Sequence, residues 1–123
     1  MTIIGLGTDL VDIKKLEKKL SGRYGKRFLE NTFTPNEISC ARGGKNIAKL
    51  ATAFAAKEAV YKAFRTGWIE GQDVEHIRKK TGAPSILLHG EIEKIAKKKN
   101  AREVQASLSF TDSHAIAVVL VIS

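Results

Sequence analysis

A glutamate lies on the apolar side of the longest helical pattern in the chain, and this position constrains the fold more than any other. Residues 46–65 are rich in Ala, Lys and Leu and predict one long helix. On a helical wheel of about 100° per residue, Glu58 falls near the middle of an apolar arc that includes Leu50 and Phe54. A carboxylate placed there costs roughly several kcal/mol unless a cation, a metal ion or hydrogen-bond donors meet it. The fold must therefore supply a partner for Glu58.

The length and charge of the chain limit what that partner can be. A chain of 123 residues with 43% hydrophobic residues predicts a single globular domain, residues 1–123, with little room for a deep cleft of its own. A short chain of this kind can instead form its site between subunits. Lys and Arg outnumber Asp and Glu by 21 to 13, a net charge of +8. This excess favours a polyanionic partner, although the same residues could simply solvate helix faces.

The cysteine and histidine content narrows the chemistry further. Cys40 is the only cysteine, which excludes an intramolecular disulfide and a zinc site built on paired cysteines, and predicts a cytoplasmic location. His76, His89 and His114 show no metal-ligand spacing and are expected at the surface or in turns. No segment approaches the roughly 18 apolar residues that span a bilayer, so we expect no membrane insertion.

The order of patterns along the chain favours the α+β class. Helical patterns dominate the first half, and Thr34 with Glu37 forms a capping-box pattern that begins a short helix. Alternating and continuous apolar runs dominate the second half and end in a predicted hairpin, whose second strand is expected to be central and buried. The predicted strands are 2–9, 74–79, 85–88, 104–110 and 115–122, and the predicted helices are 10–20, 35–44, 46–65 and 89–100.

Two carboxylates indicate a candidate metal site. Asp9 ends the first predicted strand after two glycines, and Glu58 lies on the inner side of the long helix. Two carboxylates from separate elements suit Mg²⁺, which commonly takes substrate phosphate oxygens as further ligands. Lys57 and Lys62 could then donate to a phosphate. Alternatively, Asp9 caps the following helix, and Glu58 and Lys62 form an ordinary i,i+4 ion pair.

Several segments resemble one enzyme family, the 4'-phosphopantetheinyl transferases. Gly5–Asp9 (GLGTD) is similar to their first motif, and Phe54–Ala63 (FAAKEAVYKA) is similar to their second. Phe33–Glu37, Gly82–Pro84 and Ala106–Ser109 resemble further segments of the small bacterial holo-acyl-carrier-protein synthases. The resemblance implies an antiparallel sheet packed with one long helix and several short ones.

The chain departs from the family pattern at two positions. The family usually has glycine where this chain has Arg65, which is unfavourable if the backbone there needs a positive φ angle. The family usually has histidine where this chain has Phe110. Phe110 continues an apolar strand face with Leu108, so we expect it in the core or against a nucleotide rather than on a phosphate.

The resemblance implies an activity and a set of site residues. Such enzymes transfer the 4'-phosphopantetheine arm of coenzyme A to a serine of an acyl carrier protein, as in fatty acid biosynthesis, and release adenosine 3',5'-bisphosphate. Asp9 and Glu58 would hold Mg²⁺, and Glu58, Asp9 or a water would take the serine proton. The residues that would contact coenzyme A are Lys57, Lys62, Gly67, Pro84 and Ser109.

The resemblance also implies partners. Acyl carrier proteins are small acidic helical domains, so the basic segment near the N-terminus is a candidate docking surface. Family members of this size form homotrimers with shared sites. The docking residues would be Lys15, Lys19, Arg23 and Arg27.

Two rival functions are compatible with the same composition. A basic nucleic-acid-binding domain fits the charge, but aromatic residues do not interleave with the basic runs, so we expect no nucleic-acid partner. A catalytically silent member of the same fold is the other alternative, and Arg65 and Phe110 are the features that suggest it.

Overall fold

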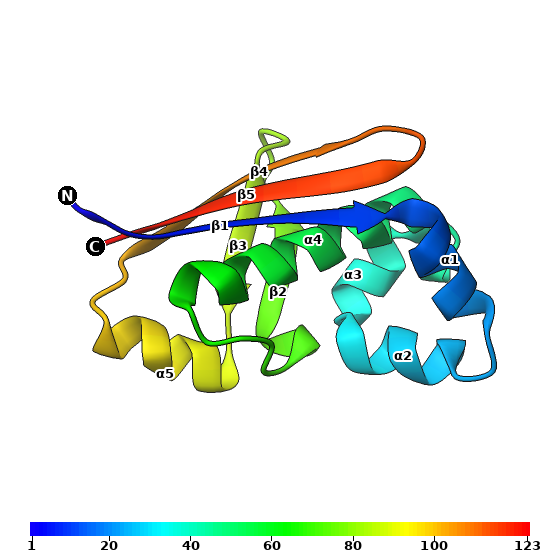
Figure 1. Ribbon diagram of the computed structural model, residues 1–123, viewed down its shortest axis with the longest axis horizontal. Helices are drawn as coiled ribbons and strands as arrows, with labels where there is room; N and C mark the ends of the chain where they lie inside the picture. Colours follow the sequence, from blue (N-terminus) through cyan, green and yellow to red (C-terminus); the bar gives the residue numbers. More distant parts are fainter.

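The computed structural model describes residues 1–123 and shows an antiparallel sheet lying along one long helix (Figure 1). The shorter helices α1, α2 and α3 gather at one end of the long helix α4, and α5 lies at the other end. The strands are β1 (Ile3–Asp12), β2 (Val74–Arg78), β3 (Pro84–Leu88), β4 (Glu103–Phe110) and β5 (His114–Ile122). The helices are α1 (Ile13–Ser21), α2 (Gly25–Thr32), α3 (Pro35–Cys40), α4 (Ile47–Phe64) and α5 (Gly90–Lys98), with short 3-10 turns at Arg42–Gly44 and Gly71–Asp73. The α+β class is confirmed.

The main sheet has the order β1-β5-β4, and both pairings are antiparallel. The predicted terminal hairpin and its central second strand are thus confirmed. The two ends of the chain meet at one end of the sheet, where the Ser123 amide donates to the Thr2 carbonyl at 2.9 Å (Figure 1). A separate two-stranded sheet is formed by β2 and β3. No helix is of the length and apolarity that a membrane crossing would need.

The two faces of the sheet differ in burial. The helix-facing side of β5 is buried, from Ala115 to Val121 at alternate positions. The expectation that β5 is buried is wrong for its other face, because helices cover only one side of the sheet. The outward apolar residues, which are 37% to 63% exposed, are Leu6, Leu10, Ile116 and Val118.

Strand β1 packs closely on α4 because two of its helix-facing residues are glycines. A Cβ atom on Gly5 would lie 2.2 Å from the Ala63 carbonyl oxygen, and one on Gly7 would lie 1.9 Å from the Ala59 carbonyl oxygen. Such distances exclude any side chain. The strand also continues to Asp12 rather than ending at Asp9.

Helix termini follow the local sequence signals. The capping box is confirmed: the Thr34 hydroxyl accepts from the Glu37 amide, and the Glu37 carboxylate accepts from the Thr34 amide. The Asp12 carboxylate caps α1 by accepting from the Lys15 amide at 3.1 Å, so the alternative that Asp9 is the cap is wrong. Helix α4 ends at Arg65, whose φ of 59° is the left-handed conformation that glycine adopts more easily.

We expect Gly7→Ala to destabilise the fold strongly, because the new methyl group would overlap the α4 backbone, which cannot move aside without separating β1 from the helix. The expected loss in unfolding free energy is about 3 kcal/mol, measured by urea denaturation. Gly22→Ala is the matched control, because a Cβ there meets nothing closer than 3.5 Å and the φ angle of −77° suits alanine. Equal stability of the two variants would contradict the proposed close packing.

Candidate functional site

A shallow pocket of about 330 Å³ lies where β1, α1 and α4 meet. Asp9 alternates with Gly5 and Gly7 along β1, so its side chain is on the helix-facing side of the strand. Glu58 belongs to the least buried stripe of α4, one turn from Phe54 and one turn from Lys62. The lining residues are Asp9, Leu10, Val11, Asp12, Lys15, Leu16, Lys19, Phe28, Phe54 and Glu58. The two carboxylates predicted as a pair therefore share one pocket.

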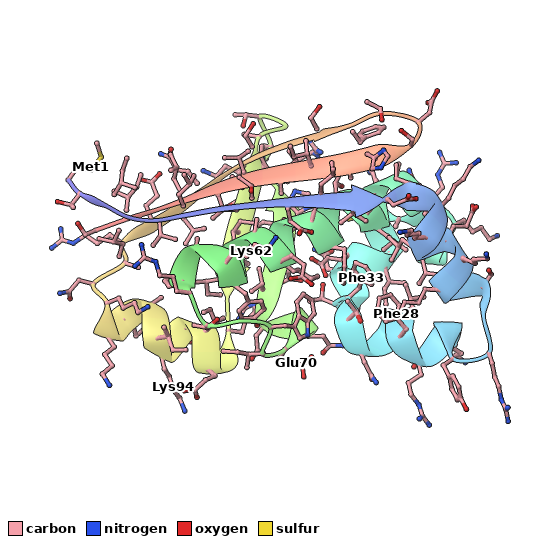
Figure 2. The ribbon with its side chains drawn as sticks, in the orientation of Figure 1. Met1, Phe28, Phe33, Lys62, Glu70 and Lys94 are labelled. Atoms are coloured by element: carbon pink, nitrogen blue, oxygen red, sulfur yellow. The ribbon has the colours of Figure 1, made fainter.

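Lys62 pairs with Asp9 and not with Glu58. Lys62 lies on α4 beside β1 (Figure 2). Its ammonium donates to the Asp9 carboxylate at 3.0 Å, which joins α4 to β1. The Asp9 side chain is 16% exposed and that of Lys62 is 55% exposed. The alternative of a simple i,i+4 pair between Glu58 and Lys62 is therefore wrong, and an exposed ammonium lies beside the carboxylate pair.

Glu58 is the residue of the pocket whose pKa is raised. Burial raises the pKa of the Glu58 carboxyl above its usual value, the nearby Asp9 carboxylate adds to the rise, and Lys62 opposes it. Two like charges held close in a partly buried pocket favour a cation between them. No group of three or more His, Cys, Asp or Glu side chains surrounds them. Two carboxylates alone suit a hard ion that takes its remaining ligands from water and phosphate.

The fully buried charge of α4 is Lys57, not Glu58. The expectation that Glu58 points into the core is wrong, because α4 is buried on nearly every side and Glu58 lies on its partly exposed stripe. The Lys57 side chain has 0% exposure. The prediction that Lys57 donates to a phosphate is contradicted as well, because its ammonium is enclosed by the protein.

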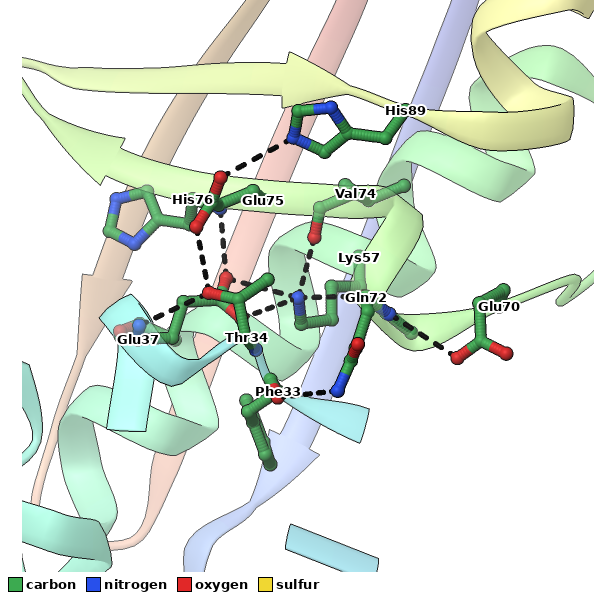
Figure 3. Close-up of polar contacts among 12 residues, drawn as sticks. Phe33, Thr34, Glu37, Lys57, Glu70, Gln72, Val74, Glu75, His76 and His89 are labelled. Carbon is green, nitrogen blue, oxygen red and sulfur yellow. Dashed lines mark hydrogen bonds and ion pairs between the residues drawn. The ribbon is translucent and has the colours of Figure 1, made fainter. Parts of the chain in front are cut away.

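The Lys57 ammonium is the centre of an interior hydrogen-bond network (Figure 3). It donates to both oxygens of Glu37, at 2.7 and 3.0 Å, and to the carbonyl oxygens of Gly71 and Val74. Glu37 also accepts from the backbone amides of Thr34 and His76, at 2.9 and 2.8 Å. We call these contacts the Lys57 network. Burial lowers the pKa of the Lys57 ammonium, and the Glu37 carboxylate opposes that shift.

The other residues expected to contact coenzyme A lie away from the pocket. Gly67 is in the segment after α4 with a φ of 74°, and Pro84 begins β3. Ser109 is exposed and lies on β4 opposite Ile116, on the outward face of the sheet. None of the three lines the pocket of Asp9 and Glu58. Within one chain, the structure therefore does not bring them together with the carboxylates.

The predicted docking residues form a basic rim. Lys15 and Lys19 line the carboxylate pocket, and the Lys19 ammonium lies 4.4 Å from the centre of the Phe28 ring. Arg23 and Arg27 are exposed and line a different hollow, which shares no residue with this pocket. Two of the four predicted docking residues therefore lie at the carboxylate pocket itself.

Phe110 is not in the core, which was one of its two expected environments. It lies at the end of β4 on the side of the sheet that faces α4, yet it is 60% exposed, so the expectation that it is core is wrong. The helix-covered part of the sheet ends before this position. A contact with a bound nucleotide stays a prediction.

Sequence reasoning missed the importance of Glu37 and misplaced His76. The sequence indicated Glu37 only as the capping-box residue at the third position of a short helix. No local pattern indicated that its carboxylate also binds a buried ammonium. His76 lies in β2 rather than in a turn, and its Nε2 atom is buried. The long-range partners of both residues come from elements that are distant in sequence.

We expect Lys57→Met to cost about 3 to 5 kcal/mol of unfolding free energy, because it leaves the buried Glu37 carboxylate without its cation. Chemical denaturation measures this loss. The double variant Lys57→Met with Glu37→Gln should recover part of it, since no charge then stays buried alone. Lys94→Met on exposed α5 is the control and should change stability little. A cost below about 1 kcal/mol for Lys57→Met would contradict the role of the network.

Comparison with known proteins assigns this arrangement to a family. The family model of the 4'-phosphopantetheinyl transferase superfamily matches residues 5–119. The holo-[acyl-carrier-protein] synthase of Solibacter usitatus is 35% identical over 122 residues, covering 96% of this chain and 97% of the relative. That of Halorhodospira halophila is 38% identical and covers 98% of both chains.

Solved structures agree with this assignment. The Helicobacter pylori holo-[acyl-carrier-protein] synthase in complex with coenzyme A has a TM-score of 0.84 at 31% identity, covering 95% of this chain and 99% of that one. The Neisseria meningitidis synthase has a TM-score of 0.89 at 28% identity, covering 99% and 100%. The chain therefore belongs to the 4'-phosphopantetheinyl transferase superfamily, and within it to the holo-[acyl-carrier-protein] synthases.

Proposed function

We propose that the protein transfers 4'-phosphopantetheine from coenzyme A to a serine hydroxyl of an apo acyl carrier protein. One observation carries this proposal: Asp9 from β1 and Glu58 from α4 line one pocket, with the Lys62 ammonium 3.0 Å from Asp9. Family membership supports the reaction class, and the coenzyme A complex of the Helicobacter pylori relative supports the choice of donor.

The residues of the pocket fit a Mg²⁺ ion. Asp9 and Glu58 would supply two hard oxygen ligands from different elements, and burial and the Asp9 carboxylate together raise the pKa of the Glu58 carboxyl, so a cation between the two would be favoured. When bound, Mg²⁺ would supply charge neutralisation for a diphosphate group. Lys62 is the exposed cation beside this position, so it would neutralise part of the charge on the same phosphates.

The reaction requires one bond to form and one to break at phosphorus. The serine oxygen attacks the phosphorus nearer the pantetheine, and the bond from that phosphorus to the bridging oxygen of the diphosphate breaks. Adenosine 3',5'-bisphosphate leaves with the electron pair. Glu58 is the proposed acceptor of the serine proton, because its carboxylate lines the pocket and is partly exposed.

We further propose that the acidic carrier protein docks on the basic rim. Lys15 and Lys19 lie at the pocket itself, and Arg23 and Arg27 extend the positive surface beyond it. A surface of this sign would speed the encounter with an acidic partner and present its serine at the carboxylates. The single free thiol, Cys40, supports the cytoplasm as the compartment.

The active assembly is proposed to be a homotrimer with sites between subunits. The outward sheet face exposes a row of apolar residues that a second copy would cover, including Leu6, Leu10 and Val118. A shared site would also explain why Gly67, Pro84 and Ser109 lie apart from the carboxylates of their own chain.

The first test incubates the protein with apo acyl carrier protein, coenzyme A and Mg²⁺, and detects the phosphopantetheine adduct by mass spectrometry. We expect Glu58→Gln to lower kcat by about 100-fold or more, and EDTA to abolish transfer. Glu91→Gln, on distant α5, is the matched control and should be fully active. Wild-type protein that binds the nucleotide but makes no adduct would be a silent member of the fold. An adduct unaffected by Glu58→Gln would disprove the mechanism.

The docking surface is tested by reversing charge at Lys15, Arg23 and Arg27. We expect KM for the carrier protein to rise about tenfold, while KM for coenzyme A stays nearly constant, because these residues form the basic rim and are not among those expected to contact coenzyme A. The control reverses Lys94 and Lys98 on α5 and should leave both values unchanged. Equal increases in the two KM values would contradict a docking role.

The trimer is tested by analytical ultracentrifugation. The wild-type protein should sediment at about three times the 13.5 kDa of one chain. Val118→Arg on the outward face should give monomers, because a buried arginine without a partner opposes association. Leu87→Arg, which changes an exposed apolar residue of β3, is the control and should stay trimeric. A monomeric wild-type protein would contradict the proposal.

A further inference from the structure

The only tryptophan of the chain, Trp68, packs on α4 and is nevertheless 41% exposed. Its ring lies against the rings of Phe54 and Tyr61, with centroids 5.5 Å apart in both pairs. Phe54 also lines the pocket of Asp9 and Glu58. Trp68 does not line that pocket itself, but its ring extends the Phe54 edge of the pocket.

Glu58 lies between Trp68 and β1 on the surface of α4. Steps of about 100° place Lys62 about 40° to one side of Glu58 and Tyr61 about 60° to the other. Lys62 donates to a carboxylate of β1, whereas Tyr61 contacts Trp68. In Figure 2, α4 with Lys62 lies between β1 and the segment that carries Glu70. The open stripe of α4 is therefore flanked by β1 on one side and by Trp68 on the other.

Hydrogen bonds to α4 hold the segment that carries Trp68. The Tyr61 hydroxyl donates to the Glu70 carbonyl at 2.6 Å and accepts from the Glu70 amide at 3.1 Å. These bonds anchor the backbone two residues after Trp68 to the helix. An aromatic ring that is already held in place loses little conformational entropy when a ligand covers it. The exposed face of Trp68 is thus suited to binding.

The edge formed by Phe54 and Trp68 is the uncharged edge of the site. Lys62 offers an exposed ammonium to anionic phosphates. The basic rim reaches the pocket through Lys19, whose ammonium lies 4.4 Å from the centre of the Phe28 ring. No lysine or arginine lies over the rings of Phe54 or Trp68. An uncharged group is therefore the ligand that this edge favours.

The parts of the two substrates differ in charge in the same way. The nucleotide and its diphosphate are anionic and suit Lys62, and the carrier protein is acidic and suits the basic rim. The pantetheine arm of the donor is uncharged. It has a dimethyl-branched carbon close to the phosphate ester, followed by amide groups.

We propose that Trp68, together with Phe54, binds the pantetheine arm of coenzyme A, with the indole ring packed against the branched carbon. This inference rests on the proposed transferase function and names a binding residue for its donor. The contact holds the arm on the side of Glu58 that faces away from β1. Trp68 is thereby a determinant of donor affinity and takes no part in proton transfer.

The first test uses the fluorescence of the wild-type protein under selective excitation of tryptophan, which reports Trp68 alone. The protein is titrated in Mg²⁺ with coenzyme A, with 4'-phosphopantetheine and with adenosine 3',5'-bisphosphate, which has the nucleotide without the arm. We expect coenzyme A and 4'-phosphopantetheine to shift the emission saturably to shorter wavelength, because the arm removes water from the indole ring. The bisphosphate should bind without this shift.

A substitution series measures the same contact by calorimetry. Trp68→Ala should weaken coenzyme A binding about tenfold and leave the affinity for adenosine 3',5'-bisphosphate unchanged. Trp68→Phe should retain most of the coenzyme A affinity, because a smaller ring still covers the branched carbon. Leu87→Ala, at a side chain of β3 that is also 41% exposed, is the matched control and should bind both ligands as the wild type does.

The outcomes separate the contact from the function. Binding of coenzyme A without an emission change, or equal losses for both ligands in Trp68→Ala, overturns the contact and leaves the transferase proposal standing. Emission that responds to apo acyl carrier protein and not to coenzyme A also overturns it, since the ring then contacts the carrier protein. Protein that binds no coenzyme A refutes the proposed function and this inference together. If Trp68→Ala does not fold, the wild-type titration alone decides between these results.

Discussion

The close contact between β1 and α4 positions the candidate site. Gly5 and Gly7 let the strand backbone meet the carbonyl groups of Ala63 and Ala59, with no side chain between them. Two residues further along the same face, the strand presents Asp9 to the stripe of α4 that carries Glu58. Larger residues at either glycine would separate the two elements, and with them the two carboxylates. The glycines of the first motif and the small residues of the second are thus the two halves of one packing interface.

The interior of the protein contains a second constraint of a different kind. The Lys57 network joins α3, α4 and the start of β2 through one buried ammonium, whose carboxylate partner is also the capping residue of α3. An interior ion pair is costly to form, but it specifies its partners closely because any misplaced element leaves a charge unpaired. Lys57 and Glu58 are adjacent in sequence, yet one determines the packing of the helix and the other faces the pocket.

Helix α4 therefore separates two regions with different electrostatic character. On one side, two carboxylates and Lys62 form a site suited to a cation and the phosphates that accompany it. On the other side, Lys49 and Arg78 line a second pocket, whose one carboxylate, Glu37, is paired with the buried Lys57 ammonium. The basic rim of α1 and α2 borders the first region only. The charged residues are therefore distributed unevenly around α4, and composition alone does not show this.

Local signals in the sequence determined the capping box of α3, the bounds of α4 and the terminal hairpin, because each depends on residues close in the chain. The placement of Asp9 and Glu58 in one pocket was also predictable, from two motifs about fifty residues apart. Only the tertiary structure decided which charge of α4 is buried. A helical wheel identifies one apolar side, but α4 is covered on nearly all sides, so the wheel selected Glu58 where the folded protein buries Lys57. The partners that make this burial tolerable come from α3, the segment after α4 and β2, and no local pattern places those elements together.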